Sequence, residues 1–457
     1  MVNTIQRRRE VSPRAVLAVM CVGYFLVLLD VTIVNVALPR IGAGLGAEVA
    51  GLQWVVDGYA LALASLMLAG GTVGDLNGHR RVVLTGLVVF GVGSLACGLA
   101  PSVGALVLAR VVQGIGAALL LPGSLAIISH AFDEPGSQAK AIGVWAGVGS
   151  LALPAGPLLG GILVESFGWR AVFLVNVPIV VLSVVAAAWT VRESVESDGR
   201  PLDRGGVVLG AAILASATVA FIEAGSSGVG SPAVIGAAVV AIALSAAFVA
   251  LERARGDAAM LPLGLFRRRA FSVSNAAACT MNLCTLGVLF VVTLYLQAVQ
   301  GRSPLAAGVA LIPLFAPLTV LAPLGGRLTS RLGSRLPMAF GLVVAGLGLA
   351  LLARAEAGSA YPALLPALLL WGIGLGILTP AVVAGAIAAV PKPRAGLASA
   401  INNTARQSGG AIGIAIAGAV AGSPLARGGF IHGFHVLGLA AAGLYALAAV
   451  ASFVLLR

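Results

Sequence analysis

Long apolar segments recur along the whole sequence, and they restrict its fold more than any other feature. We count fourteen of them, separated by glycine, proline and charge clusters. An α-helix rises about 1.5 Å per residue, so each segment is long enough to cross a hydrocarbon core of about 30 Å. The sequence therefore predicts an all-α integral membrane protein with transmembrane helices near residues 14–38, 53–74, 80–99, 103–125, 138–163, 170–190, 205–224, 232–251, 271–298, 305–329, 336–353, 361–386, 396–421 and 433–456.

The composition agrees with a chain that lies mostly in a lipid bilayer. Of the 457 residues, 59% are hydrophobic and only 10% are charged, whereas soluble domains carry about 25% charged residues. The mean hydropathy is +1.05. The four cysteines all lie in apolar segments without a CxxC spacing, so neither a disulfide framework nor a metal site is predicted.

The distribution of basic residues predicts the orientation. With the N-terminus inside, 21 of the 28 lysines and arginines fall in cytoplasmic segments, and five fall in outer loops. Such a bias predicts cytoplasmic N- and C-termini, and it explains the net charge of +12 without nucleic acid as a partner. The excess of arginine over lysine, with much alanine and glycine, is typical of GC-rich bacteria, so we expect a multi-pass protein of a bacterial inner membrane.

An internal repeat predicts how the helices are grouped. Residues 70–81 (GGTVGDLNGHRR) and 325–335 (GGRLTSRLGSR) share three glycines and an arginine at an offset of 255. The offset exceeds a six-helix half by about 65 residues, which the two spans between residues 205 and 251 fill. Such repeats are typical of transporters, whose site lies at the repeat interface. Chance similarity of two glycine-rich loops is the alternative.

These boundaries divide the chain into four parts. We predict a cytoplasmic N-terminus (1–13), an N-terminal six-helix bundle (14–190), an inserted helix pair with cytoplasmic linkers (191–270) and a C-terminal six-helix bundle (271–457).

Two ionisable side chains of the first half are predicted at matching depth. Asp30 lies about 13 Å from Pro39 at the outer end of the first span, and Arg110 lies about 12 Å from Ser102 at the outer end of the fourth. Charges at that depth are costly and usually face a bundle interior or a wet cavity. We expect Arg110 to find its acceptor in Asp30. A neutral Asp30 that only links helices, or a purely structural ion pair, are the alternatives.

Several ordered motifs carry a family resemblance. They are LDVTIVNVALP (29–39), GTVGDLNGHRR (71–81), LVLARVVQGIGAA (106–118), GP-x-x-GG (156–161), WRAVFLVNVP (169–178) and INNTARQSGGAIG (401–413). With these motifs the chain resembles the fourteen-helix drug:proton antiporter branch of the major facilitator superfamily. The resemblance implies two six-helix bundles plus two inserted helices, and it implies that Asp30 and Arg110 serve proton coupling.

The loop after the second span is short, basic and rich in glycine. Gly71 and Gly78 allow a tight reversal and close helix approach, and Asp75 can accept hydrogen bonds from helix amides or pair with Arg80 or Arg81. In the family such a loop resembles a gate on the cytoplasmic side. The alternative is that the two arginines only anchor the topology.

The fifth span combines small residues with prolines. Gly156, Gly160 and Gly161 provide a face that another helix can approach closely, and Pro157 interrupts the helical hydrogen bonds and favours a bend. The segment resembles the motif associated with antiporters. Generic close packing explains such glycines equally well.

Polar residues in other spans are candidates for a substrate cavity. Interface, aromatic-belt and interhelical roles are the alternatives for them. The candidates are Asp57, Glu223, Asn275, Asn282, Asn402 and Arg406.

The sequence contains no nucleophile–base constellation, phosphate loop or cofactor fingerprint. We therefore predict a secondary active exporter rather than an enzyme, driven by the proton gradient with no other cofactor. Its partners would be protons, the lipid bilayer and an amphipathic or cationic drug-like molecule. A dedicated exporter of one endogenous metabolite or antibiotic, and a non-transporting membrane sensor, are the alternatives.

Overall fold

The computed structural model describes residues 12–132, 134–193, 203–256, 259, 261–391 and 394–456. All regular elements within these residues are helical. The first half contains α1 (Pro13–Leu45), α2 (Val49–Asn77), α3 (His79–Gly98), α4 (Val103–Ala131), α5 (Pro135–Phe167), α6 (Ala171–Leu174) and α7 (Asn176–Thr190). The rest contains α8 (Arg204–Ser227), α9 (Pro232–Arg255), η2 (Leu263–Arg267), α10 (Arg269–Leu294), η3 (Tyr295–Val299), α11 (Pro304–Ala310), α12 (Ile312–Leu332), α13 (Arg335–Leu352), α14 (Tyr361–Ala388), α15 (Ala395–Ala421) and α16 (Arg427–Leu455).

Each of the fourteen predicted spans coincides with a helix or with two consecutive helices. The span predicted at 170–190 is divided into α6 and α7 at Val175, and the span at 305–329 into α11 and α12 at Leu311. Thirteen helices of the described chain are long and apolar enough to cross a membrane. Helix α15 is not among them, although it has 27 residues. Its first half carries Asn402, Asn403, Arg406 and Gln407, which make it polar for a membrane helix.

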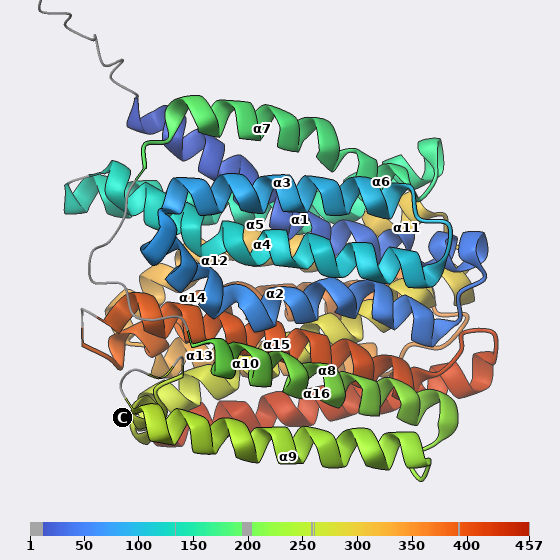
Figure 1. Cartoon of the computed structure of the whole chain (residues 1–457). Coiled ribbons are helices and arrows are strands. Elements are labelled where there is room, and N and C mark those ends of the chain that lie inside the picture. The colour runs from blue at the N-terminus through green and yellow to red at the C-terminus, as the bar shows by residue number, and fades with distance from the viewer. Residues whose placement is uncertain are drawn as a thin grey trace, which may run out of the picture.

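The helices lie side by side with their axes along one common direction (Figure 1). Helices α1 and α3–α7 form the upper part of the view, and α10, α13 and α16 lie in the lower part. Helices α2 and α15 pack against each other where the two halves meet, and α8 packs against both of them as well as against α9. The start of α1 and the end of α16 lie at the same end of the bundle, called the terminal end below. The predicted segment 1–13 falls almost entirely outside the described residues.

The same glycine contacts recur in both halves and extend the repeat beyond the loop seen in the sequence. In each case a Cβ added to the glycine would approach an atom of the corresponding residue on the partner helix, a backbone atom in most of them and a side-chain atom in the others. The matched contacts are Gly70 with Ala118 and Gly325 with Gly376; Gly86 with Gly116 and Gly341 with Gly374; Gly91 with Val180 and Gly346 with Tyr445; Gly114 with Tyr59 and Gly372 with Leu314; and Gly149 with Tyr24 and Gly409 with Cys279. Such close approach of neighbouring helices is what small residues allow in membrane proteins.

Contacts between the halves gather at the end opposite the termini. Gln53 of α2 donates to the carbonyl oxygen of Ala415 on α15 at 2.8 Å. Gln297 of η3 donates to the carbonyl oxygen of Val36 on α1 at 2.9 Å. A Cβ at Gly161 of α5 would overlap the backbone of Leu305 on α11. These contacts join three pairs of elements and close the bundle at that end. The predicted domain boundaries near residues 190 and 270 stay a prediction.

Candidate functional site

Asp30 of α1 and Arg110 of α4 form an ion pair inside the first half. Their side chains are 0% and 1% exposed. Arg110 Nη1 donates to Asp30 Oδ2, and Arg110 Nε donates to the carbonyl oxygen of Val55 at 3.0 Å. The guanidinium also lies over the Tyr59 ring, 4.2 Å from its centroid, which is a favourable cation–π position. The structure thus brings the two predicted residues into contact, while their role in proton coupling stays a prediction.

Three further buried side chains complete a polar cluster around this pair. Gln113 Nε2 donates to Asp30 Oδ1 and to Ser94 Oγ, both at 2.8 Å, and its Oε1 accepts from Arg110 at 2.8 Å. Asn176 Nδ2 lies 3.4 Å from Asp30 Oδ1 and from Ser94 Oγ. These five residues, called the polar cluster below, come from α1, α3, α4 and α7. A buried ion pair is tolerated when its remaining polar atoms are hydrogen-bonded in this way.

Sequence reasoning did not identify Ser94 and Asn176. Asn176 belongs to the motif WRAVFLVNVP, and an asparagine within an apolar segment is a usable signal. Ser94 gives no such signal, because serine is common in membrane helices. Gln113 follows Arg110 by three residues, a spacing that places both side chains on one helix face.

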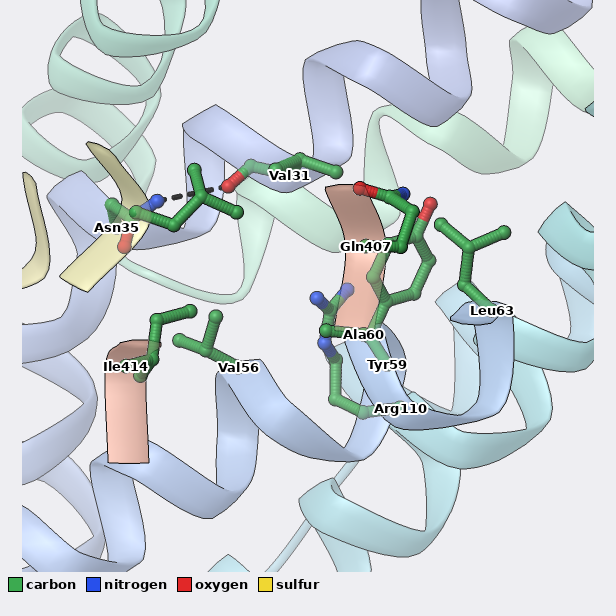
Figure 2. Close-up of a pocket in the computed structure, with 10 residues that line it drawn as sticks. Val31, Asn35, Val56, Tyr59, Ala60, Leu63, Arg110, Gln407 and Ile414 are labelled. Carbon is green, nitrogen blue, oxygen red and sulfur yellow. Dashed lines mark hydrogen bonds between the residues drawn. The ribbon is translucent and has the colours of Figure 1, made fainter. Parts of the chain in front are cut away.

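A small cavity lies beside Arg110 at the boundary between the halves (Figure 2). Its volume is about 20 Å³, which is enough for roughly one water molecule. Arg110 and Tyr59 line it from the first half, and Gln407 lines it from α15 of the second. The polar cluster therefore reaches the second half through this cavity. The remaining lining residues are Val31, Asn35, Val56, Ala60, Leu63, Leu286 and Ile414.

The loop between α2 and α3 is held by a residue that the sequence did not suggest. Gly78 has a φ of +96°, which favours glycine. The backbone N–H of Arg80 donates to Glu193 Oε1 at 3.0 Å, and Arg81 Nε lies 3.5 Å from Glu193 Oε2. Arg80 Nη2 donates to the carbonyl oxygen of Ala188 on α7 at 2.8 Å. The loop is thus attached to the end of α7.

The other predicted loop residues are less informative. A Cβ at Gly71 would make only ordinary contact with Pro122, whereas Gly70 is pressed against the backbone of Ala118. The close helix approach therefore depends on Gly70 rather than on Gly71. The side chain of Asp75 lies outside the described part of the structure.

The predicted antiporter motif of α5 contacts both halves of the protein. Gly156 and Gly160 face α1, where a Cβ at either position would overlap Thr32 or Ile33. On the opposite side, Gly161 meets α11, and a Cβ at Gly308 of α11 would overlap the carbonyl of Pro157. Helix α5 stays continuous, with Pro154 and Pro157 inside it. Small residues at these positions let α5 join α1 and α11 closely.

The substrate-cavity candidates are dispersed. Asp57 is 0% exposed on α2, and neither carboxylate oxygen has a hydrogen-bond partner among the described residues. Glu223 accepts from Ser227 Oγ at 3.2 Å near the end of α8. Asn402 donates to Asn275 Oδ1 at 3.3 Å and so links α15 to α10. The structure therefore does not gather these candidates in one place.

Asn282 and Arg406, the other two candidates, are both partly buried. Asn282 lies on α10. The Nε atom of Arg406 on α15 is buried without a hydrogen-bond partner in the described structure. Among the described residues, no group of three or more His, Cys, Asp or Glu is placed to hold a metal ion.

Solved structures share the arrangement of the helices. The POT family transporter PepTSo matches with a TM-score of 0.69 over 97% of this chain and 98% of its own, at 16% identity. At that identity the likeness concerns the fold alone.

Sequence comparisons identify the family as well as the fold. The "Multidrug resistance protein Stp" of Mycobacterium tuberculosis is 39% identical over 87% of this chain and 74% of its own length. The "Tetracenomycin C resistance and export protein" of Streptomyces glaucescens is 35% identical over 90% of this chain and 76% of its own. The profile of the Major Facilitator Superfamily matches residues 20–414. The resemblance drawn from the motifs is thereby confirmed: this multi-pass, all-α membrane protein belongs to the Major Facilitator Superfamily.

Proposed function

We propose that this protein is a secondary active exporter in which inward proton flow drives the efflux of drug-like small molecules. The observation that carries the proposal is the buried Asp30–Arg110 pair, which is linked to the boundary between the halves by the cavity at Arg110. The relatives named for multidrug resistance and for resistance and export support drug-like molecules as the cargo.

The geometry suggests how a proton could be loaded and released. Opposite charges about 4 Å apart interact by roughly 4 kcal/mol at an effective dielectric of about 20, so the attraction between Asp30 and Arg110 depends strongly on their separation. Movement of one half against the other would change both that separation and the access of water to the pair. Alternating access can therefore couple proton binding to transport.

The experiment that tests proton coupling uses purified protein in proteoliposomes with a pH difference as the only driving force. A panel of dyes and antibiotics in a pump-deficient host first supplies a transported probe. Asp30→Asn should then abolish pH-driven transport of that probe while the protein remains folded. Arg110→Lys should impair it, because a point charge does not replace the planar guanidinium. Uphill transport by Asp30→Asn under the pH difference would refute the proposal.

The same panel distinguishes the two alternatives. A dedicated exporter of one antibiotic, which the relative from Streptomyces glaucescens favours, would protect the host against one compound class only. A non-transporting sensor would give no proton-dependent flux of any probe.

We further propose that the protein lies in a bacterial inner membrane with both termini in the cytoplasm. The positive-inside bias supports this orientation, and so does the location of the start of α1 and the end of α16 at one end of the bundle (Figure 1). Reporter fusions in the linker at 252–269 should report a cytoplasmic location, and fusions at 225–231 an external one. An external signal at 252–269 would refute the topology.

A further inference from the structure

Two histidines lie next to each other at the terminal end of the first half. His79 is the first residue of α3, and His130 lies in the last turn of α4. The centroids of their rings are 5.7 Å apart, and the ring planes are inclined by 37°. The two residues are far apart in the sequence, so no short ligand motif contains both, and the sequence predicted no metal site.

The packing of α3 against α4 brings the two rings together (Figure 1). A Cβ at Gly123 of α4 would lie 2.6 Å from Val83 Cγ2, so this face of α4 is pressed against α3. His130 lies two turns after Gly123 on the same face of α4, and His79 lies one turn before Val83 on α3. The contact between the rings therefore continues the contact between the helices toward the terminal end.

The hydrogen bond of His130 determines which of its ring nitrogens can bind a metal. Its Nδ1 lies 2.8 Å from the carbonyl oxygen of Ala126, one turn earlier on α4. A carbonyl oxygen only accepts, so in the neutral ring Nδ1 carries the proton and Nε2 carries the lone pair. A hydrogen bond from Nδ1 to a backbone carbonyl is the usual support for a histidine that ligates a metal through Nε2. His130 is exposed, so an ion can reach it from the solvent.

The distance between the rings suits a shared ion. A zinc ion lies about 2.0–2.1 Å from an imidazole nitrogen, so two imidazoles on one tetrahedral ion have ring centroids roughly 5–6 Å apart. The observed 5.7 Å falls in this range. His79 is only 2% exposed, and a Cβ at Gly74 of α2 would lie 2.6 Å from its Nδ1. Helix α2 thus restricts the ring of His79 from the side opposite the solvent.

The corresponding helix ends of the second half carry no such pair. The repeat offset of 255 residues places Ser334 at the position of His79. The matched contacts of Gly116 on α4 and Gly374 on α14 place Ala388 at the position of His130. Close packing of these helix ends therefore does not require imidazole rings.

We propose that His79 and His130 together bind one transition-metal ion of the class Zn²⁺, Cu²⁺ or Ni²⁺. Imidazole suits these ions, whereas Mg²⁺ and Ca²⁺ prefer oxygen ligands. Water completes the coordination, since no group of three such ligands forms among the described residues. The ion ties the start of α3, and with it the loop between α2 and α3, to the end of α4. Both histidines belong to the first half, so the site does not depend on the proposed efflux function.

The test is Cu²⁺ binding by the full-length protein in nanodiscs of zwitterionic lipid, after purification through an affinity tag without histidine. Cu²⁺ is the probe because it binds most tightly among the divalent ions of this series, and because its electron paramagnetic resonance spectrum counts the bound ring nitrogens. At less than one equivalent, Cu²⁺ should couple to two imidazole nitrogens. Zn²⁺ should displace it, and Mg²⁺ at the same concentration should not.

His130→Gln and His79→Gln should each leave one coupled nitrogen. Each should weaken Cu²⁺ binding by about tenfold or more, because loss of a ligand costs at least as much as loss of an outer-shell partner. The matched control replaces the other two histidines of the chain, His432 and His435, by glutamine. They lie near the start of α16, where His435 Nε2 is 2.8 Å from the carbonyl oxygen of Ala355. The control should change neither the affinity nor the spectrum.

His130 is exposed, so His130→Gln should fold even if His79→Gln does not, and its result alone decides. The proposal is overturned if Cu²⁺ couples to fewer than two ring nitrogens in the wild type, if folded His130→Gln binds Cu²⁺ as tightly as the wild type, or if the control abolishes binding. Binding is measured without any gradient, so these outcomes leave proton coupling untouched.

Discussion

The two halves of the protein pack their helices alike, but the equivalent interior positions hold charged and polar side chains in the first half and mostly apolar ones in the second. The matched glycine contacts relate α1–α3 to the second half by an offset of 255 residues, α4 to α14 by 258 and α7 to α16 by 265. These offsets give each residue of the polar cluster an equivalent in the second half: Asp30 corresponds to Thr285, Ser94 to Leu349, Arg110 to Leu368, Gln113 to Trp371 and Asn176 to Ala441. The second set contains no charge, and Leu349, Leu368, Trp371 and Ala441 are all buried.

This difference separates what the fold requires from what the function requires. The second half shows that similar close helix packing accommodates uncharged and mostly apolar side chains at these positions. Burying an ion pair is often no more stabilising than packing hydrophobic residues of similar volume. Helix packing alone does not require the charged pair of the first half. We therefore expect this pair to serve a function such as proton coupling.

The largest expected effect comes from giving the first half the residues of the second. Arg110→Leu alone leaves Asp30 buried without its counter-charge and should lower the free energy of unfolding by roughly 3–5 kcal/mol. Adding Asp30→Thr should restore most of that stability, yet pH-driven efflux should remain lost. Thermal stability by size-exclusion chromatography and flux in proteoliposomes measure the two properties. A double variant as unstable as Arg110→Leu would mean that the charge pair is structural.

The second prediction compares the loop between α2 and α3 with the equivalent loop between α12 and α13. Gly78 and Gly333 both have positive φ, +96° and +74°, so alanine is strained at either position by about 1–2 kcal/mol. A Cβ at Gly78 would also collide with the Glu193 carboxylate, whereas one at Gly333 would meet no atom within 4 Å. Gly78→Ala should therefore slow efflux by roughly tenfold, and Gly333→Ala by clearly less.

Initial efflux rates in vesicles, normalised to the amount of inserted protein, measure this pair of variants. Equal rates for Gly78→Ala and Gly333→Ala would show that attachment of the loop to Glu193 does not matter for transport. The loop would then be reduced to a topology signal.

A smaller effect is expected from Asn176→Ala, which introduces the residue found at position 441 in the second half. The contacts of Asn176 Nδ2 with Asp30 and Ser94 are both long, at 3.4 Å. Because such long contacts contribute little, the rate of pH-driven efflux should fall by about threefold or less. Ala441→Ser in the second half, the control, should leave the rate unchanged.

The sequence predicted the elements better than it predicted the contacts among them. Apolar length and loop charge are local properties, so all fourteen spans were found, and the pairing of Asp30 with Arg110 followed from a simple depth argument. Ser94, Asn176 and Glu193 were missed because most of their partners lie 82 to 146 residues away; the exception is Gln113, which donates to Ser94 from 19 residues away. Pairing over such distances depends on how α3 and α7 pack against the other helices. Arg406 was identified, but that it lacks a carboxylate partner became evident only from its neighbours in space.

The smallest expected effect tests whether charge or geometry holds the loop of the first half. Arg81 has a 78% exposed side chain, and exposed ion pairs contribute about 0–1 kcal/mol. Glu193→Gln removes that pair but keeps an oxygen that can accept from the Arg80 N–H. The second half indicates that geometry suffices there. Arg335 donates to the carbonyl oxygen of Phe453 on α16 at 2.6 Å, just as Arg80 donates to that of Ala188. Arg335 forms no ion pair with a described carboxylate. The efflux rate of Glu193→Gln should stay within about twofold of the wild-type rate at low and at high salt. Glu193→Ala also removes the acceptor oxygen, so its efflux should be slower. A loss in Glu193→Gln as large as in Gly78→Ala would mean that charge holds the loop.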